Sequence, residues 1–456
     1  MSRDRWAKIV WVFTSLWMLV LMGSLMFGWL GGFFFDSSHA HVQGIDFFPV
    51  VRAFLNLTAG RSEFDTFALA YGPYATWFLY HPLLALGIGP LLAAFAPWTA
   101  YALWTAIALG LMAASAFLVM RRSDDPLRRA LAALLILGGF PVYIMLYVGN
   151  VQALLVLSIT LVLVSVDAMR EEGATRLNRN LLLAGLLLSL FSKPAVLAMV
   201  PLLLMLKQTR RTTLKALGIY AVVSFAFLVV PALNPAPIPW AERLQLAAHP
   251  AVIAQTMNVY TNGFVVTPAM KDNAVHWFAM LGLADFRLQH VDVYSLPAFL
   301  DGLLGTRTPD ALYRIPAILV LEMSVLLLFV RQRAQRLEAA LMVLMAASLI
   351  VFLSYGLVWE YHYTGVLPIA ALLLMRKRPS ALEWAIIALG VVTWLPSLYF
   401  AVRTQDSTQL WVQTVIRLNR VVPVLLIFIL LLIRAGSAAL EGGLQTRPVL
   451  GDEPAV

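Results

Sequence analysis

The chain has 456 residues, of which 61% are hydrophobic and only 12% are charged, and its mean hydropathy is +0.81. Long apolar runs recur from end to end, which excludes a soluble fold and indicates a polytopic helical membrane protein, because each span needs about 20 apolar residues. The chain has no cysteine, which excludes disulfides, thiolate metal sites and a cysteine nucleophile. Its formal net charge of +9 is typical of cytoplasmic loops that retain Lys and Arg, and we prefer that interpretation to nucleic-acid binding.

The apolar runs predict an all-α bundle of about twelve transmembrane helices, with both termini cytoplasmic. The first run is too long for a signal-peptide core and lacks a clear cleavage site, so we interpret it as a span. Basic clusters such as Arg121-Arg122 and 376–378 mark the inner ends of spans. The expected spans are 7–31, 98–120, 128–145, 150–168, 181–192, 196–207, 216–233, 312–330, 337–355, 363–375, 381–399 and 418–433.

Two regions depart from a regular series of helix hairpins. Residues 74–96 are apolar enough to span, but a span there would place the cluster after Arg121 outside, and Gly87, Gly89 and Pro90 interrupt the run. We therefore predict a juxtamembrane or re-entrant segment on the outer side. The short runs 181–192 and 196–207 meet at Lys193-Pro194, which predicts a hairpin that stops within the bilayer, as broken helices at ligand sites do.

These assignments predict one transmembrane domain over residues 1–434. Two long outer segments interrupt it, at 32–97 and 234–311, and no internal repeat is obvious. The small, polar residues 435–456 predict a disordered cytoplasmic tail.

Asp46 is the first candidate for chemistry. It lies in GIDFF, just after the first span, between Ile45 and two phenylalanines. Desolvation there would raise its pKa toward that of a useful general base. A plain helix cap or loop residue is the alternative that the sequence leaves open.

Other polar groups also collect on the outer side of this topology. Glu360 and His362 open one span, where they either face a cavity or belong to an interfacial aromatic belt. Asn150 and Gln152 open another, where amides either bind a sugar or cap the helix. Lys193 either binds a phosphate or snorkels to the headgroups.

The remaining signals are weaker. Glu322 lies mid-span and is expected to pair inside the bundle. The sequence has no phosphate-cradling glycine loop, no HExxH and no GxSxG. The His and Asp spacings make no convincing metal site, so a divalent metal is not expected.

Four outer elements follow one another along the chain: GIDFF, YHPL, GNVQALLVL with AGLLLSLFSKPAVL, and SYGLVWEYHYTGVLP. In this order the chain resembles the polyprenyl-phosphate-sugar-dependent glycosyltransferases of the GT-C superfamily. It looks most like glycosyltransferase family 87, which includes bacterial polyprenyl-phosphate-mannose-dependent mannosyltransferases. The elements are similar to that family's outer-loop aspartate, Tyr-Pro-Pro element, Gly-Gln-x-Asn helix start with a Lys-Pro hairpin, and Trp-Asp-His-His segment.

This chain departs from the family pattern in the last two elements. The order of Asn150 and Gln152 is reversed, Glu360 replaces the aspartate, and Tyr361 replaces the first histidine. These departures leave the acceptor open.

The resemblance implies that a sugar, with mannose as the first expectation, moves from a polyprenyl-phosphate donor to a lipid or glycan acceptor. The reaction would invert the anomeric carbon at the outer face of the cytoplasmic membrane, without a cofactor and without a nucleic-acid partner. Asp46 would be the catalytic general base. The substrate-binding residues would be His362, Glu360, Lys193, Asn150, Gln152, Tyr80, His81, Arg52 and Asn258.

Two other functions stay open. A lipid-linked glycan flippase or transporter should show inverted repeats and charges along the bundle axis, which are not apparent here. A surface polysaccharide ligase or polymerase would use Arg and His of a large outer loop, where Arg243, His249, His276, Arg287 and His290 lie.

Overall fold

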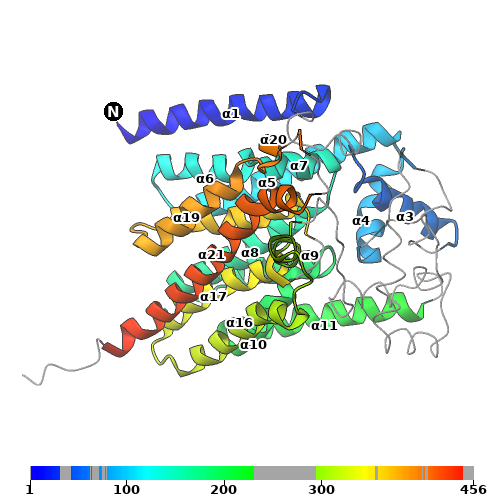
Figure 1. Ribbon diagram of the computed structural model, residues 1–456. Helices are drawn as coiled ribbons and strands as arrows, with labels where there is room; N and C mark the ends of the chain where they lie inside the picture. The colour runs from blue at the N-terminus through cyan, green and yellow to red at the C-terminus, as the bar shows by residue number, and fades with distance from the viewer. Residues whose placement is uncertain are drawn as a thin grey trace, which may run out of the picture.

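The computed structural model describes residues 2–30, 43–61, 63, 71–73, 78, 80–230, 294–354, 358–402, 404–405 and 409–444 (Figure 1). These residues form helices and turns without a β-strand, which confirms the expected all-α architecture. The helices are α1 (Arg3–Phe27), α3 (Phe48–Thr58), α4 (Pro82–Leu92), α5 (Pro97–Met120), α6 (Pro126–Gly138), α7 (Phe140–Val148), α8 (Gln152–Glu171), α9 (Arg176–Leu190), η1 (Pro194–Met199), α10 (Val200–Met205), α11 (Lys207–Val229), α15 (Leu296–Leu304), η4 (Asp310–Arg314), α16 (Ile315–Leu326), η5 (Leu327–Phe329), α17 (Arg333–Ser354), η6 (Glu360–Val366), α18 (Leu367–Leu374), α19 (Ala381–Trp394), α20 (Tyr399–Val402) and α21 (Leu410–Leu444).

Among the described residues, 7 helices are long and apolar enough to cross a membrane by length and composition. They are Arg3–Phe27, Pro97–Met120, Pro126–Val148, Gln152–Glu171, Ala311–Phe329, Arg333–Ser354 and Leu410–Leu440. Shorter helical segments occupy four of the other expected spans: α9, η1 with α10, η6 with α18, and α19. Helix α11 occupies the remaining expected span, 216–233, and its first turns carry Lys207, Arg210 and Arg211. The chain is therefore a multi-pass membrane protein.

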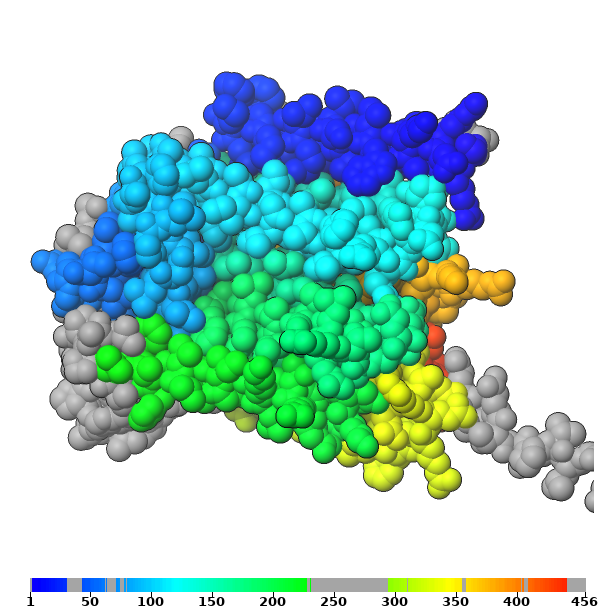
Figure 2. All heavy atoms as spheres, turned by 180° about the vertical axis from the view of Figure 1, so that it is seen from behind, coloured from blue at the N-terminus to red at the C-terminus, as the bar shows by residue number. Residues whose placement is uncertain are grey.

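Helices α8 and α17 form the centre of the bundle. Nearly every residue of α8 is buried, and it packs against α5, α9 and α17, whereas α1 exposes most of its side chains. In Figure 1 the long helices run roughly side by side, and the start of α1 and the C-terminal part of α21 lie at the same end. Seen from behind in Figure 2, α1 lies along the outside of the helices coloured cyan.

A break between α6 and α7 shows how the bundle satisfies its backbone. Gly139 is extended and Pro141 has no N–H, so carbonyls near the break lose their helical donors. An indole nitrogen replaces one of those donors, because Trp17 donates to the Gly138 oxygen at 2.8 Å. Trp394 also donates to the Leu134 oxygen within α6 at 3.2 Å. Such replacement is needed where no water reaches the backbone.

Helices α3 and α4 pack against each other at one end of the bundle (Figure 1). Helix α4 has 11 residues and contains Pro90. At 1.5 Å per residue it is about 16 Å long, which is too short to cross a bilayer. The part of 74–96 that the structure describes therefore agrees with the prediction of a segment that does not span.

Two expectations need correction. Glu322 is exposed on α16 rather than paired inside the bundle, because its position on the helix faces outward. Helix α21 continues to Leu444, so the tail expected to be disordered from 435 begins as helix. Residues 445–456, 31–42 and 231–293 lie outside the described residues.

Candidate functional site

A tight turn between α7 and α8 carries the first polar side chains. Gly149 has φ 70°, and a Cβ there would lie 2.6 Å from the Phe47 Cβ, so the position requires glycine. Trp104 donates to the Gly149 oxygen at 2.9 Å. The Tyr101 hydroxyl donates to the Leu146 oxygen at 2.8 Å. The turn is therefore fixed to α5 on one side and to the segment before α3 on the other.

The same turn positions Asp46. The Asp46 amide donates to the Val148 oxygen at 2.9 Å, and the Gly44 amide donates to the Tyr147 oxygen at 2.8 Å. Phe47, which follows, is buried. Two backbone hydrogen bonds and a buried aromatic side chain thus hold the carboxylate against the end of α7.

The Asp46 carboxylate is hydrogen-bonded but desolvated. The Asn150 side-chain amide donates to its Oδ2 at 2.7 Å and to the Tyr80 hydroxyl at 3.2 Å. Burial raises the pKa of Asp46 above its ordinary value, against the hydrogen bonds from Asn150 and Tyr361 and the attraction of Lys193. A carboxylate with a raised pKa is a stronger base than an ordinary aspartate.

Lys193 approaches the same cluster from the break after α9. Its ammonium donates to the Gln152 Oε1 at 3.0 Å, contacts the His362 Nε2 at 3.0 Å, and lies 5.0 Å from the centre of the Tyr361 ring. Burial lowers the pKa of Lys193 to about 7, although the negative charge of Asp46 opposes this effect. An anion bound here would favour the charged form of Lys193.

His362 is neutral and is held by the backbone of Trp359. Burial lowers its pKa well below the ordinary value and the Lys193 charge lowers it further, against a hydrogen bond to the Trp359 backbone. Its Nδ1 accepts from the Trp359 backbone N–H at 2.9 Å and lies 3.2 Å from the Trp359 oxygen, while its Nε2 lies 3.0 Å from the Lys193 Nζ. The Gln152 amide donates to the His362 backbone oxygen at 3.2 Å, which fixes this segment to α8.

Tyr361 is a site residue that the sequence did not single out for a role. Its hydroxyl hydrogen-bonds the Asp46 carboxylate, and its ring lies beside the Lys193 ammonium. The signal in the sequence is its place in WEYHY, where Tyr361 departs from the pattern of the family that the chain resembles. We name Asp46, Tyr80, Asn150, Gln152, Lys193, Tyr361 and His362 the Asp46 cluster.

The structure does not bring the other expected residues to the Asp46 cluster. Glu360 is buried, and its Oε1 accepts from the Arg420 guanidinium and from the Ser397 amide at 3.2 Å. This differs from the expected role in donor binding, because a missed residue, Arg420 of α21, already engages the carboxylate. We expect the pair to hold the segment that carries His362.

His81 and Arg52 also have partners within the fold. The His81 Nδ1 accepts from the Leu83 amide at 3.0 Å, which caps α4, and its Nε2 lies 3.3 Å from the Ser224 hydroxyl. Burial lowers the pKa of His81 to about 3, so its ring is neutral. Arg52 is buried and donates to the Tyr71 oxygen at 3.0 Å. Asn258 lies outside the described residues.

The described residues contain no group of three or more His, Cys, Asp or Glu side chains that could hold a metal ion. Comparisons of the chain with protein-family models, curated proteins and solved structures give no match. Function must therefore be inferred from the residues of the Asp46 cluster.

Proposed function

We propose that this protein is an inverting membrane glycosyltransferase of the GT-C type that uses a polyprenyl-phosphate sugar. One observation supports it above the others: a desolvated carboxylate, Asp46, and a desolvated ammonium, Lys193, share one network of amides and hydroxyls at one end of the bundle. Transfer of a sugar from a phosphate needs a base for the acceptor and a cation for the leaving group.

In the proposed reaction the acceptor hydroxyl oxygen attacks the anomeric carbon as the bond from that carbon to the phosphate oxygen breaks. Asp46 takes the proton of the acceptor hydroxyl. The phosphate leaves with the bonding electron pair, and Lys193 stabilises the developing charge. Because attack and departure occur on opposite faces of the sugar, one displacement inverts the anomeric configuration.

The neighbouring groups would orient the base and the cation. Asn150 and Tyr361 hydrogen-bond Asp46, and Gln152 and His362 contact Lys193. Both reactive groups are thereby held before a substrate binds, which reduces the reorganisation needed in the transition state.

The short helices α3 and α4 support a lipid-linked donor. Each has 11 residues, and they lie at the same end of the bundle as Asp46, whose turn leads directly into α3. A polyprenyl tail cannot leave the bilayer, so its phosphate must be received at the membrane surface. We propose mannose as the first sugar to test, a lipid or glycan of the cell envelope as the acceptor, and the outer face of the cytoplasmic membrane as the location.

The test is donor consumption by purified protein in nanodiscs. The wild type is incubated with a panel of radiolabelled polyprenyl-phosphate sugars and a membrane lipid extract as acceptor. Asp46→Asn is compared with Asp124→Asn, a matched change at an exposed position that touches none of the cluster. Consumption that is lost only in Asp46→Asn supports the proposal. Consumption of no donor by the wild type, or full activity in Asp46→Asn, contradicts it.

A further inference from the structure

A second charged site lies at the opposite ends of the helices that carry the Asp46 cluster. Gln152 opens α8 at the cluster, whereas Asp167 and Arg170 lie near its end. At 1.5 Å per residue, Asp167 and Arg170 lie about 22 and 27 Å from Gln152 along the axis of α8. A pocket of ≈ 700 Å³ lies at this end, and its lining includes six cations, Arg122, Arg170, Arg376, Lys377, Arg378 and Arg434, and three carboxylates, Asp167, Glu171 and Glu338. Two carboxylates outside the lining also pair with these cations: Glu172 with Arg122, and Glu383 with Arg376 and Arg434.

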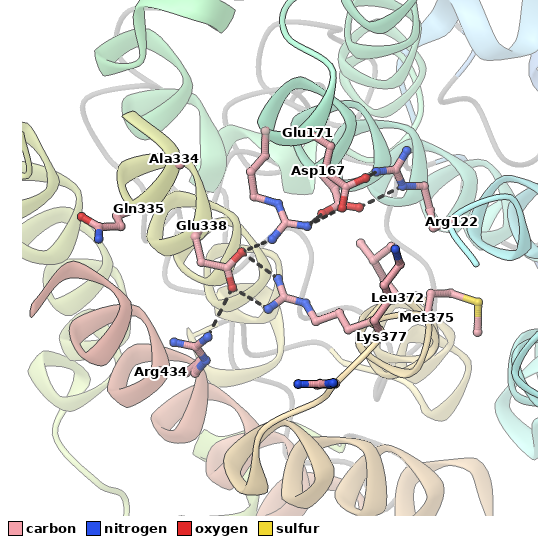
Figure 3. Close-up of a pocket in the computed structure, with 13 residues that line it drawn as sticks. Arg122, Asp167, Glu171, Ala334, Gln335, Glu338, Leu372, Met375, Lys377 and Arg434 are labelled. Atoms are coloured by element: carbon pink, nitrogen blue, oxygen red, sulfur yellow. Dashed lines mark hydrogen bonds and ion pairs between the residues drawn. The ribbon is translucent and has the colours of Figure 1, made fainter. Parts of the chain in front are cut away.

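Ion pairs join the walls of this pocket across α8, α17 and α21 and the turns that follow α5 and α18. In Figure 3 the Glu338 carboxylate on α17 points toward the other charged side chains of the pocket, with Arg434 of α21 beside it. Glu338 pairs with Arg170 at 2.5 Å, with Arg376 at 2.5 Å and with Arg434 at 3.5 Å. Arg122, at the end of α5, pairs with Asp167 at 2.9 Å. These ion pairs therefore order the lining of the pocket without a ligand.

Two cations that line the pocket take no part in these ion pairs. Lys377 and Arg378 are exposed, and neither side chain has a salt bridge or hydrogen bond within the described parts of the chain. Their loop is nevertheless anchored, because the Arg128 guanidinium donates to the Lys377 backbone oxygen at 3.1 Å and to that of Arg376. The two positive charges are thus held beside the pocket without carboxylate partners.

A buried donor also lacks a partner. The Nε–H of Arg170 is buried and has no hydrogen-bond acceptor among the described residues, although the other nitrogens of that guanidinium pair with Glu338, Asp167 and Glu171. Unsatisfied buried donors are uncommon and indicate an absent water or ligand acceptor.

We propose that this pocket binds a phosphate group, most simply that of an anionic membrane lipid such as phosphatidylglycerol. A phosphate provides several oxygens for cationic donors, and basic pockets between helices at a membrane surface are suited to anionic headgroups. The site is independent of the proposed glycosyl transfer, since it shares no residue with the Asp46 cluster.

The experiment is a titration of the full-length protein in neutral maltoside micelles, followed by the midpoint of thermal unfolding. Short-chain phosphatidylglycerol, short-chain phosphatidylcholine and inorganic phosphate are the three probes. The midpoint should rise saturably with phosphatidylglycerol, because a ligand that binds the folded state stabilises it. In the double variant Lys377→Gln with Arg378→Gln the apparent Kd should increase about thirtyfold. Each surface cation contributes about 1 kcal/mol to the binding of an anionic lipid.

The matched control is Arg211→Gln with Lys215→Gln, which removes two exposed cations from α11 that do not line the pocket. This variant should bind phosphatidylglycerol like the wild type. A saturable response to inorganic phosphate, lost in the pocket variant, supports the phosphate site and identifies a soluble source. No saturable response to either anionic probe, or equal losses in both double variants, overturns the proposal.

Discussion

The two ends of α8 use charge in opposite ways. At the Gln152 end, one carboxylate and one ammonium are desolvated and linked through neutral amides, so burial raises the pKa of Asp46 and lowers the pKa of Lys193 to about 7. At the Arg170 end, carboxylates and guanidinium groups contact one another directly. Direct pairing keeps charges fixed, whereas incomplete compensation makes proton transfer accessible near neutral pH. This difference favours a catalytic role for the Gln152 end and a structural or anion-binding role for the Arg170 end.

The largest effect should come from Asp46→Asn. The amide keeps the shape but cannot accept the proton of the acceptor hydroxyl, so kcat should fall on the order of 10³- to 10⁴-fold. Single-turnover kinetics with the donor found in the panel would measure it. Asp124→Asn should retain wild-type turnover, and an equal fall in both variants would refute a specific role for Asp46.

The next largest effect concerns folding rather than chemistry. Glu360→Gln leaves Arg420 buried without its carboxylate partner, which should lower the free energy of unfolding by about 3–5 kcal/mol. Thermal unfolding in detergent measures the loss. The double change to Glu360→Gln with Arg420→Met should recover part of it, because it removes the uncompensated charge. A variant that unfolds like the wild type but no longer binds donor would instead restore the substrate-binding role expected from the sequence.

Lys193→Met should lower kcat about 10²-fold, because the leaving phosphate would lose its cation.

The wild-type pH profile of kcat/KM should be bell-shaped. Activity should rise with pH as Asp46 loses its proton, at a pH above the ordinary aspartate range, and should fall near pH 7 as Lys193 loses its proton in the free enzyme. Lys193→Arg should move the alkaline limb to higher pH, since arginine stays protonated. If the alkaline limb does not move in Lys193→Arg, the group that titrates there is not Lys193.

Tyr361→Phe should give the smallest effect, a loss of about tenfold, as expected for one hydrogen bond to a charged group. The Tyr361 hydroxyl lowers the pKa of Asp46 against the effect of burial. Its removal should therefore raise that pKa further and shift the acid limb to higher pH. A reduced rate with an unchanged acid limb would assign Tyr361 to substrate contact instead of tuning the base.

Much of the fold could be predicted from local features of the chain. A helical segment of the structure lies at each expected span, because long apolar runs bounded by Gly, Pro and basic residues specify helices in lipid. The break at Lys193-Pro194 and the short helix within 74–96 were also predictable, since Pro and Gly interrupt the runs. The surface position of Glu322 was not, because apolarity alone does not say which face of a span meets the bundle.

At the candidate site, the residue types and their order along the chain identify Asp46 and the outer polar residues from which its partners come. Packing between distant helices sets which of these residues meet. Asn150 reaches Asp46 across 104 residues of chain and Lys193 reaches His362 across 169, whereas Glu360 pairs with Arg420. Glu360 and Tyr361 are neighbours in sequence, yet one joins a buried ion pair and the other joins the base. The direction of a side chain at the start of a helix depends on packing between distant helices, which a local pattern does not contain.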